Sequence, residues 1–126
     1  MFEVVKTGLL PSPAPVNGTV RAGSTIYSVQ VPRDQSTGKT VEGGIDVQMR
    51  QTLQNLKQAM EAGGGTLADV AQVIIYLTRK SDFDGMNKVY KEFFQQPYPS
   101  RATIVADLIG EGCLVEIVAH AHLGSA

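Results

Sequence analysis

Apolar residues recur along the chain at two spacings, and the change from one to the other divides it into predicted elements. From residue 45 to residue 60 the interval is three or four positions, which is the period of a helix. Gly63, Gly64 and Gly65 follow, and glycine accepts the backbone conformation that a helix end needs. The pattern predicts a first helix ended by these glycines. Its apolar stripe consists of Ile45, Met49, Leu53, Leu56 and Met60.

A second stripe with the same period predicts a second helix. It lies behind Ser81 and Asp84, which have the spacing of a capping box. Pro97 and Pro99 stop this helix, because proline lacks the amide hydrogen that a helix uses. Its apolar side chains are Phe83, Met86, Tyr90, Phe93 and Phe94.

Segments rich in β-branched and aromatic residues predict the strands. The segments are 20–22, 24–31, 70–77, 101–108 and 114–122, with a further short strand beginning at Val41. Gly110 and Gly112 separate the last two segments, which indicates a hairpin. Thr66 and Asp69 have capping-box spacing and predict a brief helical turn before residue 70.

The order of these elements predicts an α/β chain of the α+β two-layer type, in which two helices cover one face of a mixed sheet. The opposite face of the sheet stays uncovered in so short a chain. Because the sequence is apolar, we expect a partner chain to cover that face. No repeat, linker or low-complexity tract interrupts residues 1–126, which predicts a single domain.

Composition narrows the functional classes. With 43% apolar residues, 18% charged residues and a net charge of -1, the chain is globular and carries no basic run for nucleic acid or anionic lipid. Cys113 is the only cysteine, so neither an internal disulfide nor a thiolate zinc site is possible. No apolar run approaches the ~20 residues that cross a bilayer, and residues 1–15 do not resemble a signal peptide. We expect a cytoplasmic protein that binds neither nucleic acid nor membrane.

Arg101 is the first candidate for chemistry. It begins a predicted strand, on the face shared by Thr103, Val105 and Asp107. A guanidinium group offers a planar fork that matches a carboxylate. On residue type alone a solvated strand end is the more common explanation, because arginine is mostly exposed in proteins.

Glu116 is the second candidate, since it lies in the apolar segment 114–119, where an unpaired carboxylate is costly. If Leu108 pairs with Cys113 across the predicted hairpin, Thr103 becomes a diagonal neighbour of Glu116. One ordered water could then bridge the two side chains. An exposed face of an edge strand explains Glu116 equally well.

His120 and His122 are two positions apart and therefore point to one side of a strand. Two histidines can bind a metal, but no third ligand is evident nearby. We expect no metal site.

Several segments in correct order resemble the Rid (YjgF) family. Residues 28–38 read Ser-Val-Gln-Val-Pro with Asp34 and Thr37-Gly38, which is similar to the family's Ser-Gly-Gln-Ile-Pro…Asp…Thr-Gly segment. Segments 51–56 and 82–94 resemble its two helices. Segments 100–103 and 114–117, Ser-Arg-Ala-Thr and Leu-Val-Glu-Ile, resemble its C-terminal signature.

The resemblance implies a chorismate-mutase-like (YjgF) fold with a six-stranded mixed sheet, and a homotrimer whose sheets form a barrel. The sites lie in clefts between subunits, where Arg101 would grip the carboxylate of a small enamine or imine. A water near Thr103 and Glu116 would then hydrolyse the substrate to a keto acid and ammonia without a cofactor. The other residues that line or support the pocket would be Ser28, Phe83 and Asn87.

Two substrate-binding positions depart from the family pattern. Val16 stands where the family has a tyrosine, and Val29 stands where it has a glycine, while Val118 replaces a common glutamate. These changes favour a specialised substrate of the enamine or imine class. They are also compatible with a non-catalytic trimer that binds small carboxylates. The ribonuclease activity reported for some relatives fits poorly with a chain that lacks a basic stripe.

Overall fold

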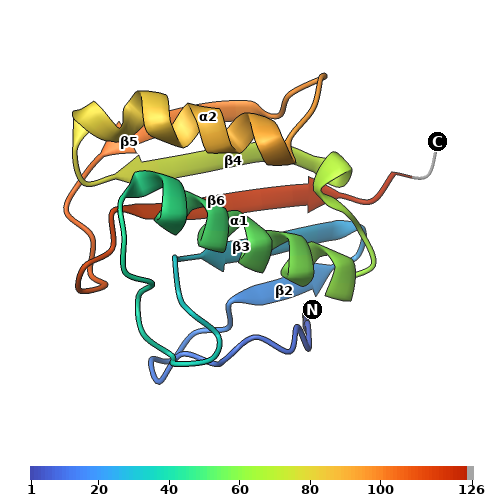
Figure 1. The fold of residues 1–126 in the computed structure, drawn as a ribbon. Helices are drawn as coiled ribbons and strands as arrows, with labels where there is room; N and C mark the ends of the chain where they lie inside the picture. The colour runs from blue at the N-terminus through green and yellow to red at the C-terminus, as the bar shows by residue number, and fades with distance from the viewer. Residues whose placement is uncertain (125–126) are drawn as a thin grey trace.

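The structure is a computed structural model that describes residues 1–124. Two helices lie side by side on one face of a six-stranded mixed sheet with strand order β1-β2-β3-β6-β4-β5 (Figure 1). No helix among these residues is long and apolar enough to span a membrane. The elements are β1 (Glu3–Val4), β2 (Thr19–Ala22), β3 (Thr25–Gln30), α1 (Ile45–Ala62), β4 (Val70–Leu77), α2 (Phe83–Phe93), β5 (Ser100–Val105) and β6 (Val115–His122).

Helix α1 confirms the prediction at both ends. It begins at Ile45 and ends before Gly63, whose amide donates to the carbonyl oxygens of Ala59 and Met60. Gly64 adopts a φ of 96°, in the left-handed region that favours glycine. The predicted stripe turns inward, and its members from residue 49 onward have no accessible surface: Met49, Leu53, Leu56 and Met60.

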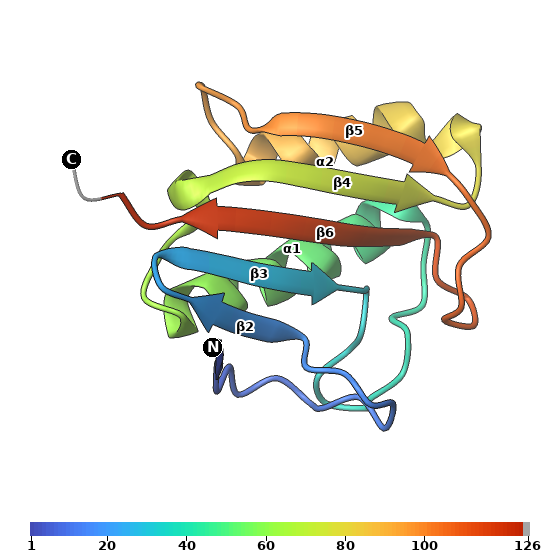
Figure 2. The same cartoon turned by 180° about the vertical axis from the view of Figure 1, so that it is seen from behind.

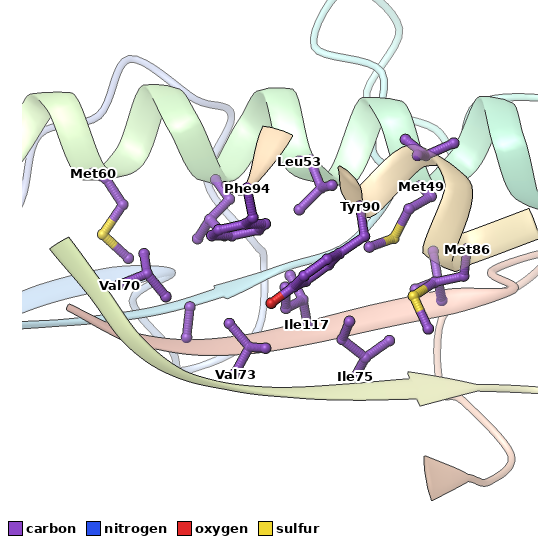
Figure 3. Packing of buried hydrophobic residues seen from close by; sticks show 14 of the residues in the cluster. Met49, Leu53, Met60, Val70, Val73, Ile75, Met86, Tyr90, Phe94 and Ile117 are labelled. Carbon is purple, nitrogen blue, oxygen red and sulfur yellow. The ribbon is translucent and has the colours of Figure 1, made fainter. Parts of the chain in front are cut away.

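The core lies between the helices and one face of the sheet. Figure 3 shows Met49 and Leu53 of α1 and Tyr90 of α2 packing onto Ile75 and Ile117 of the sheet. Strand β6 contributes every second residue to this layer, and β4 does so from Val73 onward, as the alternation of side chains along a strand requires. Burial of these apolar side chains is the main stabilisation of the chain.

The predicted hairpin between the last two strands is wrong. Strand β6 lies between β3 and β4 and runs antiparallel to both, whereas β5 pairs in parallel with the far side of β4 (Figure 2). The reason is burial: one face of β6 is closed by the helices, so β6 belongs at the centre, while β5 is mostly exposed and forms an edge. Strand β5 also ends at Val105, so Asp107 lies beyond it.

Two smaller predictions concern the helix starts. Thr66 and Asp69 do form a capping box, in which the amides of Ala68 and Thr66 donate to their side chains at 3.2 and 2.8 Å. Ser81 and Asp84 do not, because a 3₁₀ turn over residues 80–82 precedes α2.

The sixth strand is β1 and not the segment at Val41. That segment makes only an isolated bridge between Arg33 and Thr40. Strand β1 has two residues, Glu3 and Val4, which pair with Arg21 and Val20 of β2. So short a strand carries almost no periodic signal in the sequence.

Candidate functional site

Arg101 lies on the helix-covered side of the edge strand β5, since it pairs with the core residue Val73 of β4. Its guanidinium carbon is 4.7 Å from the ring centre of Tyr90 and 5.8 Å from that of Phe83. Its Nη1 also lies 3.9 Å from the sulfur of Met86. Aromatic faces attract a cation at such distances. Arg101 forms no ion pair within the described part of the chain, so its fork remains available for an anion.

The ring of Tyr90 packs against the guanidinium group of Arg101. The residue is 4% exposed, and its hydroxyl has no hydrogen-bond partner among residues 1–124. Burial raises the pKa of Tyr90, and the positive charge of Arg101 opposes this shift only in part. The phenol therefore stays neutral and presents an uncharged aromatic face to the guanidinium.

Three further predicted residues lie on the same side of the sheet. Phe83 and Asn87 are four positions apart on α2 and therefore share a helix face, with Phe83 against Arg101. Thr103 follows Arg101 on the same face of β5 and is paired with the core residue Ile75. Together with Arg101 and Tyr90 they form what we call the arginine cluster.

Glu116 lies on the opposite, uncovered face of the sheet, where it pairs with Tyr76 of β4. The side chain is half-buried, and burial raises the pKa of its carboxyl group above the usual value. Glu116 lines an open hollow of about 850 Å³. Val16 and Val29, the two positions predicted to contact substrate, line the same hollow.

The predicted contact between Thr103 and Glu116 is therefore wrong. Strand β4 separates β5 from β6, so the two backbones lie roughly 10 Å apart at ~4.8 Å per strand. Thr103 points to the helix side, and Glu116 points to the open side. Within one chain the arginine cluster and the hollow cannot act on the same small molecule.

Ser28 belongs to neither cluster. Its side chain points to the helix side of β3 and is buried. The Ser28 hydroxyl accepts a hydrogen bond from Nε2 of Gln30 at 2.9 Å and lies 2.8 Å from the hydroxyl of Thr19. These bonds fix the end of β3, which also carries Val29 into the hollow. In this chain Ser28 acts as a support.

The wall of the hollow formed by the N-terminal segment is held by bonds that sequence reasoning missed. Nη1 of Arg33 donates to the carbonyl oxygens of Pro11 and Leu10 at 2.9 and 3.2 Å. Oε1 of Gln35 accepts from the amide of Leu10 at 2.6 Å. These hydrogen bonds join loop residues that are far apart in the sequence, so no local spacing predicts them.

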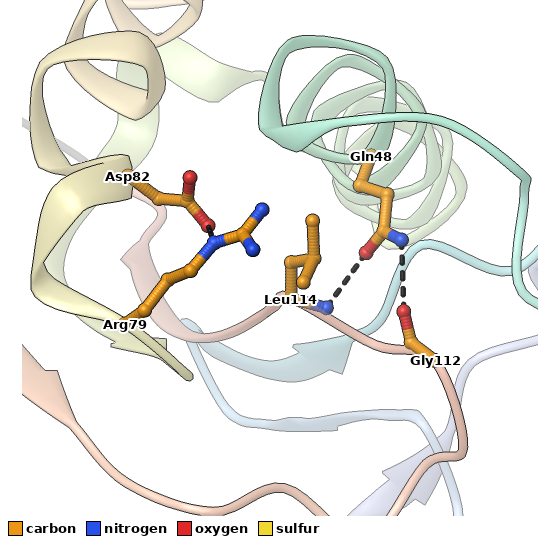
Figure 4. A network of polar contacts seen from close by, with 5 residues as sticks. All are labelled: Gln48, Arg79, Asp82, Gly112 and Leu114. Carbon is orange, nitrogen blue, oxygen red and sulfur yellow. Dashed lines mark hydrogen bonds and ion pairs between the residues drawn. The ribbon is translucent and has the colours of Figure 1, made fainter.

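The loop before β6, whose Ile109 and Gly110 line the hollow, is held further along by Gln48 of α1 (Figure 4). Its Nε2 donates to the carbonyl oxygen of Gly112 at 2.9 Å, and its Oε1 accepts from the amide of Leu114 at 2.7 Å. Figure 4 also shows the ion pair of Arg79 with Asp82, at 2.8 Å, near the start of α2. The Gln48 bonds fix the chain two residues before Glu116 and so set where β6 begins.

The two histidines make side-chain contacts of their own. The rings of His120 and Tyr27 pack edge to face, with their centres 5.2 Å apart. Nδ1 of His122 lies 3.2 Å from the hydroxyl oxygen of Thr25. Over residues 1–124 there is no group of three or more His, Cys, Asp or Glu residues that could hold a metal.

Comparisons with known proteins give the family. The sequence matches the family model described as Endoribonuclease L-PSP over residues 10–123. A RutC family protein of Pyrococcus horikoshii is 38% identical over 124 residues, which cover 97% of this chain and 98% of the relative. A 2-iminobutanoate/2-iminopropanoate deaminase of Dermatophagoides farinae is 35% identical over 117 residues, 91% of each chain.

A solved structure agrees with these relatives. The crystal structure of RidA from an Antarctic Psychrobacter superposes with a TM-score of 0.89 at 32% identity, covering 95% of this chain and 98% of that one. The chain belongs to the Endoribonuclease L-PSP family, and its likeness to RidA confirms the Rid family and fold inferred from the motifs.

Proposed function

We propose that this protein is a cofactor-independent imine deaminase. It hydrolyses a small carboxylated enamine or imine to a keto acid and ammonia, in clefts between the subunits of a homotrimer. Relatives named as imine deaminases are 31–35% identical to the chain, which supports such an activity. The chain's one cysteine is free and buried, which suits a cytoplasmic location where thiols stay reduced.

One observation carries the proposal: the guanidinium of Arg101 is seated on aromatic rings and pairs with no carboxylate of the described chain. Arginine in such a setting binds a planar anion through two parallel hydrogen bonds. A substrate carboxylate supplies that anion. Thr103 shares the face of Arg101 on β5, and Asn87 shares the helix face of Phe83, so these two polar groups can complete the substrate contacts.

Assembly supplies the second half of the site. The uncovered face of the sheet exposes large apolar side chains on β3 and β5, among them Tyr27, Val29 and Ile104. A monomer seldom leaves so extended an apolar face in water. In a trimer that covers this face, the arginine cluster of one chain can meet the hollow and Glu116 of the next.

The chemistry needs few groups. Water attacks the imine carbon, a C–O bond forms, and the electron pair of the C=N bond moves to nitrogen. Glu116 accepts a proton of the attacking water and delivers it to nitrogen, which gives a carbinolamine. A second transfer moves the hydroxyl proton to nitrogen, the C–N bond breaks, and ammonia leaves as the C=O bond forms. A raised pKa makes this carboxylate a stronger base than an ordinary glutamate, which favours the first transfer. Holding substrate and water together supplies several further kcal/mol.

The test is ammonia release from 2-iminopropanoate, generated in the assay by an amino-acid oxidase. The wild-type protein should accelerate release above the buffer rate, and Arg101→Ala should not. Arg50→Ala is the matched control, since Arg50 pairs with Glu92 on the surface of the helix layer. A wild-type protein that binds keto acids but leaves the buffer rate unchanged, both for this imine and for larger aliphatic 2-imino acids, would instead support the non-catalytic, carboxylate-binding alternative.

A further inference from the structure

The hollow beside Glu116 carries an unusual number of exposed apolar side chains. Val16 is 60% exposed, Val29 and Leu10 are 43% and 41% exposed, and Ile109 in the loop before β6 is fully exposed at 101%. All four line the one hollow. They come from separate segments, namely the N-terminal segment, β3 and the β5–β6 loop, so their meeting is a product of the fold. Exposed apolar groups gathered in this way indicate a surface that binds something apolar.

The charged residues of the lining do not change this character. Arg33 is occupied by the carbonyl oxygens of Leu10 and Pro11, and Lys6 is exposed to solvent. Glu116 is half-buried, as Arg33 is, and burial raises the pKa of its carboxyl group. An apolar group placed beside Glu116 would meet aliphatic side chains.

We infer that the substrate is a 2-imino acid with a branched aliphatic side chain, larger than that of 2-iminopropanoate. This inference rests on the proposed function, and it gives each end of the substrate a binding place in the protein. The carboxylate lies on Arg101 of one chain of the proposed trimer, and the aliphatic side chain lies in the hollow of the neighbouring chain, against Val29 and Ile109. No aromatic residue lines the hollow, so an aromatic substrate would find no ring to stack on.

Val29 and Ile109 are then specificity-determining residues. Each added methylene in an apolar pocket changes the preference between two substrates by about tenfold or more. The imine derived from leucine should therefore exceed the imine derived from alanine by at least about tenfold in kcat/KM. The reaction is the same for both: water adds to the imine carbon, and ammonia leaves.

The experiment compares the two imines, each generated from its amino acid by an oxidase, and corrects for hydrolysis in buffer. Val29→Thr and Ile109→Thr each replace an aliphatic contact by a hydroxyl and should lower the leucine-to-alanine ratio roughly three- to tenfold. Val47→Thr is the matched control, because Val47 is an exposed apolar residue of α1 outside the hollow, and its ratio should not change.

A binding measurement separates the inference from the function on which it rests. Calorimetry should find that 4-methyl-2-oxopentanoate binds more tightly than pyruvate, by a factor that Ile109→Thr reduces. Turnover of both imines with no preference would overturn the inference and leave the deaminase in place. A binding preference without turnover would overturn the deaminase and support the ligand class. No turnover together with equal binding would overturn both.

Discussion

The two faces of strand β6 have opposite surroundings although they alternate along the same eight residues. Toward the helices, Val115, Ile117, Ala119 and Ala121 have no accessible surface. Toward the open side, the residues between them remain partly exposed, Glu116 and Val118 among them. The difference arises because α1 and α2 cover only one face. The covered face holds the chain together, and the open face carries the half-buried Glu116 and exposed apolar side chains.

The largest expected effect comes from shortening one side chain on each face of β6 and comparing the losses of stability. Ile117→Ala should lower the free energy of unfolding by about 2–5 kcal/mol, because it leaves a cavity in a closed core. Val118→Ala, one position along, should cost less, and its cost should depend on protein concentration if the open face is an interface. Chemical denaturation at several concentrations measures both. Equal, concentration-independent losses would refute the distinction.

Arg101 tests the helix side of β5. In the proposed mechanism, Arg101→Ala removes two charge-assisted hydrogen bonds to the substrate carboxylate at ~1.5–3 kcal/mol each. The value of kcat/KM should then fall at least about tenfold, and by more than a hundredfold when both are lost. Arg101→Lys should fail nearly as badly, since a point charge does not reproduce the fork. Thermal melting of both variants is the control for folding. Unchanged turnover in the Ala variant would sink the arginine-anchored mechanism.

Ile104 tests the open side of the same strand. It pairs with Tyr76 and is exposed in the single chain. In the proposed trimer, Ile104→Lys places a charge at the interface, although a lysine can extend its ammonium toward water. The concentration at which the trimer dissociates should rise by about tenfold. Light scattering measures this, and a wild-type protein that stays monomeric at micromolar concentration would contradict the trimer itself.

The smallest expected effect concerns the pH dependence of stability at Glu116. Because burial raises the pKa of this carboxyl group in the folded chain, the protonated form is favoured by folding. The stabilisation is complete below the pKa of the unfolded chain and is lost as pH rises through the raised value. Wild-type protein should therefore lose melting temperature relative to Glu116→Gln over that rise. Glu42→Gln, in an exposed loop, should run parallel to the wild type.

The sequence predicts an element correctly where the residues that determine it lie close together in the chain. The three glycines fixed the end of α1, and Thr66 with Asp69 fixed the turn before β4. Pairing between distant strands has no such signal. Gly110 and Gly112 suggest the turn of a hairpin between β5 and β6. The loop that contains them instead passes β4, and β6 lies between β4 and β3. For the same reason the sequence offers the candidate site residues individually but not their distribution over the two faces of the sheet.

That distribution has a genetic consequence. If every cleft combines Arg101 from one chain with Glu116 from its neighbour, two inactive variants can complement each other. Arg101→Ala and Glu116→Gln, dissociated and reassembled together in equal amounts, would regain intact pairs in about a quarter of the clefts of randomly mixed rings. Neither variant alone could form one such pair. The functional unit of this protein would then be the interface between two polypeptides. Two variants that are each inactive could therefore restore activity when both are present in one cell.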